Sequence, residues 1–433
     1  MSLLLVRGGR VLDPSRGVDA RLDVVVDGDR IKAVGTDLAG QARYERVIDA
    51  SGALVVPGLV DMHCHFREPG REGDETIATG SAAAVRGGFT SVAVMPNTEP
   101  AVDDQADAEF QVLQGTRAGK ARVYPIGAIT KERKGASLSE MGGLVRGGAV
   151  AFSDDGDPVR SAEVMRAALL YSKMLGKAII QHAEDPDLAG SGVMHAGRVS
   201  LTLGLPGKSA ASEEVMIARD ITLVALTGGR LHVAHASTSG SVELIRQAKR
   251  RGLAVTAEAC PHHFTLTDEA VCSFDPNFKM NPPLRTQVDV EAIITGLADG
   301  TLDAIASDHA PHAREKKEVE FVDAPNGVIG LETMLPISFT ALGLRKGLPL
   351  ARIIETLTIG PSKILGIPAG TLAPGAAADL AVLDIETPYA VGGRFASKSS
   401  NCPFIGWEVR GRAQATIVGG RVVYERAQDD LGW

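Results

Sequence analysis

The sequence predicts an α/β protein: a (β/α)8 TIM-like barrel with a small β-sandwich domain formed by both chain ends. In the middle of the chain, eight short apolar runs rich in β-branched residues alternate with helical stretches. Alternating strands and helices form a parallel sheet, and eight repeats favour a closed barrel over an open sheet. The two ends lack this alternation and consist of short strand-like segments separated by glycine-containing turns.

The predicted barrel strands are 58–63, 90–96, 122–128, 149–153, 177–182, 230–235, 254–259 and 302–307. The predicted helices are 75–87, 103–119, 159–176, 211–228, 239–252 and 287–300. Several of them end on glycine, the usual residue at a helix C-terminus. Because chain termini often lie close together, we expect the strand-rich ends to form one domain. The predicted boundaries are 1–54 and 366–433 for the two parts of the β-sandwich and 55–365 for the barrel.

The composition excludes several classes of protein. The 433 residues include 45 Lys and Arg and 53 Asp and Glu, so the formal net charge is −8. An excess of carboxylates disfavours binding to nucleic acid or to a membrane surface. No apolar run approaches the roughly 18–20 residues of a membrane span, and we expect no signal peptide. Four cysteines without a CxxC spacing predict a reducing, cytoplasmic compartment.

Side chains that can bind metals follow the predicted strands, at the end where barrel enzymes build active sites. His63 and His65 alternate on the first strand, so both face the barrel mouth. Polar clusters also follow strands four, five, six and eight, at 153–156, 182–185, 232–235 and 307–309. Each cluster alone has an ordinary structural explanation, but their conjunction predicts a metal site. Imidazoles and carboxylates without a thiolate pair favour zinc or another borderline divalent metal, and five such ligands suit two metals.

Seven motifs carry a family resemblance: PGLVDMHCHFREPG at 57–70, MPNT at 95–98, FSDDG at 152–156, HAED at 182–185, HVAHAST at 232–238, KMNPPLR at 279–285 and SDHAPH at 307–312. In these motifs the chain resembles the dihydroorotases of the amidohydrolase superfamily, in their bacterial class I zinc type. The resemblance covers essentially the whole chain. It implies a hydrolase acting on cyclic amides, which reversibly cyclises N-carbamoyl-L-aspartate to dihydroorotate in pyrimidine biosynthesis.

The resemblance also implies roles for single residues. It implies two zinc ions per subunit, bridged by Asp155 and a hydroxide, and Asp308 as the general acid and base. The implied metal ligands are His63, His65 and Asp155 for one zinc, and Asp155, His182 and His235 for the other. The implied substrate-binding residues are His65, Arg67, Asn97, Asn281, His312, Asn326 and Gly327. A homodimer is expected, and association with aspartate carbamoyltransferase is compatible with the resemblance.

Other readings stay open from the sequence. A hydantoinase- or allantoinase-type enzyme is one, although these relatives usually bridge their metals with a carboxylated Lys on strand four, where this chain has none. A non-catalytic scaffold for aspartate carbamoyltransferase is another, although it should have lost ligand histidines. Spacing alone does not decide which Asp of 154–155 bridges the metals, and Asp155 follows the family pattern. We expect His235 rather than His232 to point inward and His195 to be solvated. The charged run 313–325 is either a solvated loop or a mobile lid.

Overall fold

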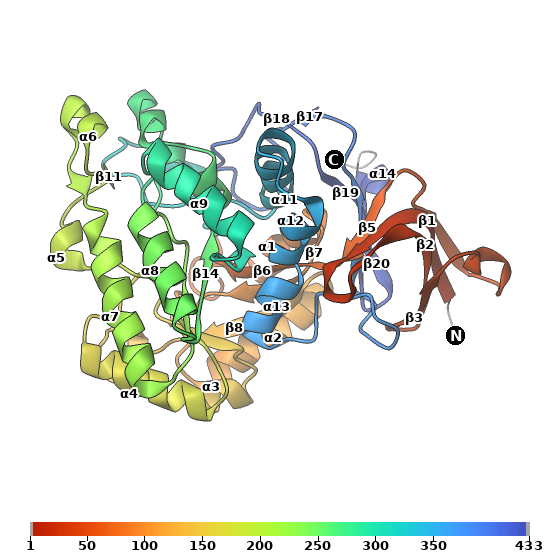
Figure 1. The fold of residues 1–433 in the computed structure, drawn as a ribbon, viewed down its shortest axis with the longest axis horizontal. Helices are drawn as coiled ribbons and strands as arrows, with labels where there is room; N and C mark the ends of the chain where they lie inside the picture. The colour runs from red at the N-terminus through yellow and green to blue at the C-terminus, as the bar shows by residue number, and fades with distance from the viewer. Residues whose placement is uncertain (1–2, 430–433) are drawn as a thin grey trace.

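A ring of strands surrounded by helices makes up most of the molecule, and a β-sheet domain containing both chain ends lies beside it (Figure 1). The structure, a computed structural model, describes residues 3–429. Residues 1–2 and 430–433, which the sequence assigns to the β-sandwich, lie outside the described residues.

The barrel consists of eight parallel strands in the order β15-β14-β13-β10-β9-β8-β7-β6. A bridge between Cys64 and His309 closes the ring, and the His65 N–H donates to the His309 carbonyl at 2.8 Å. All eight predicted strands are present, and the barrel is confirmed. Their bounds are β6 Leu59–Cys64, β7 Phe89–Val94, β8 Arg122–Gly127, β9 Ala151–Ser153, β10 Ile179–Gln181, β13 Leu231–Val233, β14 Val255–Ala259 and β15 Ala304–Ile305.

Four of the six predicted helices begin at a residue whose side chain caps the first turn. Thr76, Asp104, Ser161 and Thr238 each accept a hydrogen bond from a backbone N–H of the first turn of a helix. The six predicted helices are α1 Ile77–Arg86, α2 Gln105–Ala118, α4 Ala162–Met174, α7 Ala211–Thr227, α8 Ser239–Arg250 and α9 Gln287–Asp299. The prediction did not include α3 Met141–Arg146, the helices that follow β15, or the short elements between β10 and α7. The helices after β15 are α10 Arg314–Lys317, α11 Met334–Ser338, a π-helix at Phe339–Arg345, α12 Leu350–Thr356, α13 Ile359–Leu365 and α14 Arg426–Asp429. The elements between β10 and α7 are α5 Pro186–Ala189, β11 Met194–His195, α6 Arg198–Leu203 and β12 Gly207–Lys208.

The two chain ends share one sheet. Its order is β20-β19-β16-β5-β1-β2-β3, with β4 pairing on β1. The N-terminal strand β5 joins the halves, because it pairs with β1 on one side and with the C-terminal strand β16 on the other. A separate cluster of buried side chains, including Val11, Val55 and Val382, forms the core of this domain. The strand bounds are β1 Leu3–Asp13, β2 Val18–Asp27, β3 Arg30–Gly35, β4 Arg46–Asp49, β5 Leu54–Pro57, β16 Leu380–Asp384, β19 Arg412–Val418 and β20 Arg421–Glu425.

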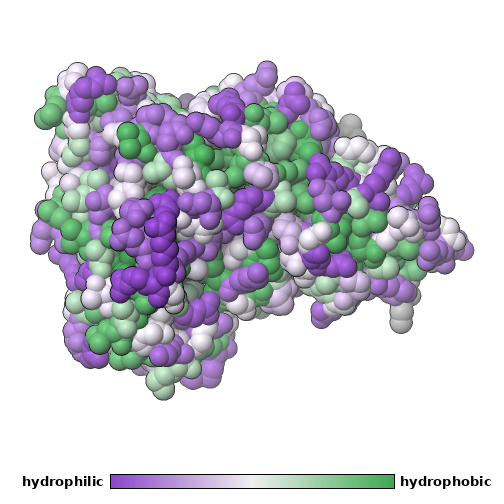
Figure 2. All heavy atoms as spheres, viewed as in Figure 1, coloured by the Kyte–Doolittle hydropathy of each residue, from purple (hydrophilic) through white to green (hydrophobic). Residues whose placement is uncertain are grey.

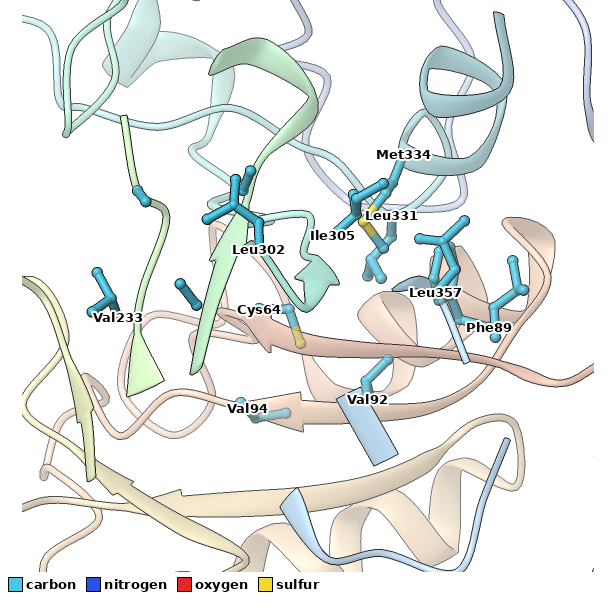
Figure 3. Packing of buried hydrophobic residues seen from close by; sticks show 14 of the residues in the cluster. Cys64, Phe89, Val92, Val94, Val233, Leu302, Ile305, Leu331, Met334 and Leu357 are labelled. Carbon is cyan, nitrogen blue, oxygen red and sulfur yellow. The ribbon is translucent and has the colours of Figure 1, made fainter. Parts of the chain in front are cut away.

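The largest hydrophobic cluster joins the barrel strands to the surrounding helices. Figure 3 shows part of it, with Val92 and Val94 of β7 near Cys64 of β6. Cys64 is fully buried and its thiol donates to the Ala93 carbonyl, so it is a small core residue. On the face shown in Figure 2, hydrophobic residues are scattered among hydrophilic ones. Within residues 3–429, no helix has the length and apolar character needed to cross a membrane.

Candidate metal centre and substrate cavity

Four histidines from three barrel strands converge on Asp155, which follows β9. Asp155 Oδ1 lies 3.4 Å from His63 Nε2 and 3.5 Å from His235 Nε2. The same oxygen lies 3.7 Å from His182 Nδ1, and Oδ2 lies 3.5 Å from His65 Nε2. These are the five residues that the family resemblance implied as metal ligands. The neighbouring Asp154 faces elsewhere, because its carboxylate accepts the backbone N–H groups of residues 129 and 130.

Asp308 completes this group from the segment after β15. Its Oδ1 lies 3.1 Å from His65 Nε2 and 3.5 Å from His63 Nε2. Among the described residues, neither His63 Nε2 nor Asp155 Oδ1 has a hydrogen-bond partner, although both atoms are buried. Buried polar atoms without partners are costly and rare. Imidazole nitrogens and carboxylate oxygens are ligands of borderline divalent metals, so this cluster fits a bound cation.

The electrostatics also favour a cation at this cluster. Burial opposes ionisation of Asp155, but the charge of His63 and the neighbouring imidazoles of His182 and His235 lower the pKa of Asp155 well below its usual range. The pKa of Asp308 is also lowered, because His63 and His65 outweigh the effect of burial. Two ionised carboxylates in a buried site need a compensating positive charge, which a protonated His63 or a bound cation can supply.

Three residues that follow barrel strands adopt backbone conformations that are uncommon for side chains other than glycine. The φ angles of Arg67, His235 and Asp308 are 60°, 31° and 45°. Such strained positions cluster at functional sites, where the surrounding structure holds them in place. Each of the three follows a barrel strand, so the strain re-aims side chains at the barrel mouth.

A cavity of about 410 Å³ opens above the cluster. All seven residues that the resemblance implied for substrate binding line it, together with Asp155, His182, His235 and Asp308. Arg67 donates from Nε to the Pro311 carbonyl at 3.3 Å, and burial, together with the charge of Arg71, lowers its pKa to about 10. Arg67 is therefore still charged at neutral pH. A buried guanidinium in a cavity is suited to grip a carboxylate.

His312 is a neutral neighbour of Arg67. Burial and the charge of Arg67 lower the pKa of His312 to about 3, and its Nε2 donates to the Asn326 carbonyl at 2.7 Å. Asn281 contacts the proposed ligand His182, with 3.2 Å between Asn281 Nδ2 and His182 Nε2. These contacts bring the expected substrate residues and the expected metal ligands into one site.

The structure adds side chains that the sequence interpretation did not include. Arg71 and Arg133 line the same cavity. Lys208 donates from Nζ to Asn281 Oδ1 and to Glu184 Oε2, both at 2.6 Å, and so fixes the Asn281 amide. Glu258 lies beneath the cluster, 2.6 Å from His63 Nδ1. The only available signal was for Glu258, a carboxylate at the end of an otherwise apolar predicted strand.

Other histidines differ in where they lie. His235 points to the cluster as expected, whereas His232 contacts Glu258 and Thr256. The prediction of a solvated His195 is wrong: it lies buried on β11, 3.2 Å from Arg285. His262 and His263 are buried but are not part of the cavity lining.

The charged run 313–325 packs against the barrel at several points. It contains the short helix α10 Arg314–Lys317. The buried Lys317 donates to the carbonyls of Pro325 and Gly327 at 2.9 and 3.0 Å, and Lys316 pairs with Asp74. These contacts tie the run to Gly327 at the edge of the cavity. Whether it moves as a lid stays a prediction.

Residues 54–423 match the amidohydrolase family. The chain belongs to this family. It is 53% identical over 423 residues to the dihydroorotase of Pelotomaculum thermopropionicum, covering 98% of each chain. It is 51% identical over 424 residues to the dihydroorotase of Pelobacter propionicus, covering 98% of this chain and 100% of that one.

Two solved structures share the fold of this chain. The chain superposes on the L-hydantoinase (dihydropyrimidinase) of Arthrobacter aurescens with a TM-score of 0.87 and 27% sequence identity, covering 98% of this chain and 96% of that chain. The dihydropyrimidinase of Brevibacillus agri gives a TM-score of 0.82 at 24% identity, with coverage of 98% and 95%. The fold is therefore shared with enzymes of other names and does not decide the substrate, which must be argued from the cavity.

Proposed function

We propose that this amidohydrolase is a dihydroorotase, which interconverts N-carbamoyl-L-aspartate and dihydroorotate. The observation that carries the proposal is that the Arg67 guanidinium lines the same cavity as Asp308, beside the carboxylate–imidazole cluster. A cyclic amide that carries a carboxylate satisfies both, because Arg67 binds the carboxylate and Asp308 lies near the ring. The identity of about half of all residues to proteins described as dihydroorotases supports the same substrate.

We infer that the cluster holds two zinc ions. Five protein ligands are too many for one catalytic zinc with an open position, whereas a shared carboxylate suits a pair of metals. His63, His65 and Asp155 would hold one ion, and Asp155, His182 and His235 the other. When bound, the zinc ions supply a nucleophilic water at neutral pH and polarise the amide carbonyl.

The protein's own residues bind the substrate and move the proton. Arg67, with Asn97 and the neutral His312 beside it, orients the substrate through its carboxylate. Asp308 takes a proton on a carboxylate oxygen when water attacks and delivers it to the departing amide nitrogen. In the direction of ring closure, Asp308 takes the proton from the ureido nitrogen and releases it to the departing water.

The alternatives predict different substrates or none. A hydantoinase or allantoinase needs no residue that binds a carboxylate on the ring. In addition, residues 149–153 of strand four contain no Lys to bridge the metals. A non-catalytic scaffold has no need for the complete ligand set around Asp155. We therefore favour the enzyme over both.

Turnover of dihydroorotate, hydantoin and allantoin by the purified protein tests the proposal, together with its zinc content. We expect about two equivalents of zinc and a clear preference for dihydroorotate. A preference for hydantoin or allantoin would overturn the substrate assignment, and a protein without metal or turnover would favour the scaffold. Mass measurement in solution, alone and with aspartate carbamoyltransferase, tests the proposed homodimer and the association. We place the enzyme in the reducing cytoplasm, since all four cysteines are unpaired.

A further inference from the structure

Glu258, on β14, is a fully buried carboxylate beneath the proposed metal centre. It is not among the residues that line the substrate cavity, and the proposed mechanism does not use it. Its Oε1 lies 2.6 Å from His63 Nδ1, and the same oxygen accepts the backbone N–H of His235 at 3.3 Å. One oxygen atom therefore contacts a proposed ligand of each of the two metals.

We propose that Glu258 is a positioning residue that holds one ligand of each metal in its binding orientation. The inference rests on the proposed metal centre. Glu258 acts on His63 through the imidazole ring and on His235 through the backbone, and it touches neither metal.

The contact with His63 fixes which ring nitrogen binds. A carboxylate can only accept hydrogen bonds, so His63 Nδ1 must donate to Glu258. In a neutral imidazole, Nε2 then carries the lone pair. That nitrogen is the buried atom without a partner, 3.4 Å from Asp155 Oδ1. A carboxylate behind a ligating histidine also strengthens the ligand, and removing such a partner commonly weakens metal binding 10- to 100-fold.

The contact with His235 holds a strained residue. With φ at 31°, His235 lies in a backbone region that side chains other than glycine rarely adopt. Its N–H donates to Glu258, while its Nε2 lies 2.9 Å from His182 Nδ1. Loss of the acceptor would leave this conformation less well determined and would move an imidazole of the second metal site.

A second buried layer orients Glu258 itself. Glu258 Oε2 lies 3.1 Å from His232 Nε2, and His232 Nδ1 lies 2.9 Å from Thr256 Oγ1. Both carboxylate oxygens thus have partners, and rotation of the side chain would break its contacts with His63, His235 and His232. This arrangement gives His232, which is not a proposed metal ligand, a role in the same chain of contacts.

The structure also offers a matched control. Glu213, on α7, is a buried carboxylate that accepts from the Ser237 N–H and from the Ser241 hydroxyl. It pairs with Arg285 and touches no proposed metal ligand. Replacing Glu213 removes a buried carboxylate that contacts neither His63 nor His235 directly.

The test is the zinc affinity of the full-length protein, measured by competition with a chromophoric chelator. We expect Glu258→Gln to weaken zinc binding about 10- to 100-fold and Glu213→Gln to change it by less than about 3-fold. The visible spectrum of the cobalt-substituted protein should change in Glu258→Gln and stay the same in Glu213→Gln. In a His63→Asn background, the effect of Glu258→Gln should fall to about 3-fold or less, because its main target is missing.

Several outcomes would overturn the inference. Unchanged zinc affinity and cobalt spectrum in Glu258→Gln would do so, as would equal losses in the Glu258 and Glu213 variants, which would indicate a general effect on folding. An undiminished effect in the His63→Asn background would show that Glu258 does not act through His63. Wild-type protein that binds no zinc would overturn the proposed function as well, so the two failures are distinguishable.

Discussion

The carboxamide oxygen of Asn97 accepts a hydrogen bond from Nδ1 of His65 at 2.8 Å. Asn97 follows β7 and His65 follows β6, so the contact joins the ends of two neighbouring barrel strands. It also joins a residue proposed to bind the substrate to one proposed to bind zinc. With Nδ1 of His65 protonated, the lone pair lies on Nε2, the nitrogen that faces Asp308 and Asp155.

We expect Asn97→Ala to impair both functions. The KM for N-carbamoyl-L-aspartate should rise, since a substrate contact is lost, and zinc affinity should fall about 10-fold, since His65 loses the partner that orients it. Arg67→Lys is the control: it should raise KM, because Lys cannot reproduce a forked contact to a carboxylate, but leave zinc affinity unchanged. Steady-state kinetics and chelator competition on both variants check this. Full zinc affinity in Asn97→Ala would show that the contact does not orient the ligand.

Asp308→Ala should abolish turnover and leave zinc bound. Asp308 lies 3.1 Å from His65 Nε2 and could in principle either move protons or bind metal. If Asp308 transfers protons, kcat of Asp308→Ala should fall by about 100-fold or more, and the zinc content of the purified variant should be unchanged. Metal analysis after dialysis distinguishes the two roles. A substantial loss of zinc would make Asp308 primarily a ligand.

The sequence predicted what depends on short stretches of chain. The barrel strands and six helices followed from local hydrophobic periods and capping residues. The convergence of His63, His65, His182 and His235 followed because parallel strands in a barrel bring their C-terminal ends to one mouth. The end of a strand can be located from the local sequence alone. Predicting that its side chains reach the barrel mouth therefore requires no information about tertiary packing.

What the sequence did not predict depends on contacts between distant residues. Glu258 is 195 positions from His63, and Lys208 is 73 positions from Asn281. Neither pair has a spacing that a motif could encode. His195 was misplaced for the same reason: the segment around it has no strong period, but Met194 beside it packs with Phe321 in a small separate cluster.

Gly327→Ala should damage the substrate cavity. Gly327 has a φ of 115°, and an added Cβ would lie 2.5 Å from Ala310 Cβ and 3.5 Å from His312 Nε2. We expect a KM increase of about 10-fold, because the segment that contacts His312 must shift. Gly375→Ala is the control, since Gly375 has a φ of 86° but no atom within 4 Å of its added Cβ. Both variants should lose about 1–2 kcal/mol of stability from backbone strain, but only Gly327→Ala should change KM. Equal KM values for Gly327→Ala and Gly375→Ala would show that the contact between the added Cβ and Ala310 does not disturb the substrate cavity.

Glu332 should make the stability of the protein depend on pH. Burial, with a contribution from Glu75, raises the pKa of Glu332 to about 7, although Arg86 lies 3.2 Å away and opposes the shift. Below about pH 4.5, Glu332 is protonated in both the folded and the unfolded chain. Between about pH 4.5 and 7, the folded state keeps a proton that the unfolded state releases. The free energy of unfolding therefore falls as pH rises through this window, by at most about 3 kcal/mol.

Glu332→Gln tests this, because the amide does not titrate and keeps an oxygen to accept from the backbone N–H groups of Ala396 and Ser397. We expect the variant to match wild type near pH 4.5 and to be more stable by up to about 3 kcal/mol at pH 8. Urea unfolding at both pH values measures the difference. Glu315→Gln, on an exposed position of α10, should follow wild type at both. If the Glu332→Gln and wild-type curves stay parallel from pH 4.5 to 8, Glu332 is ionised in the folded protein throughout, and Arg86 outweighs its burial.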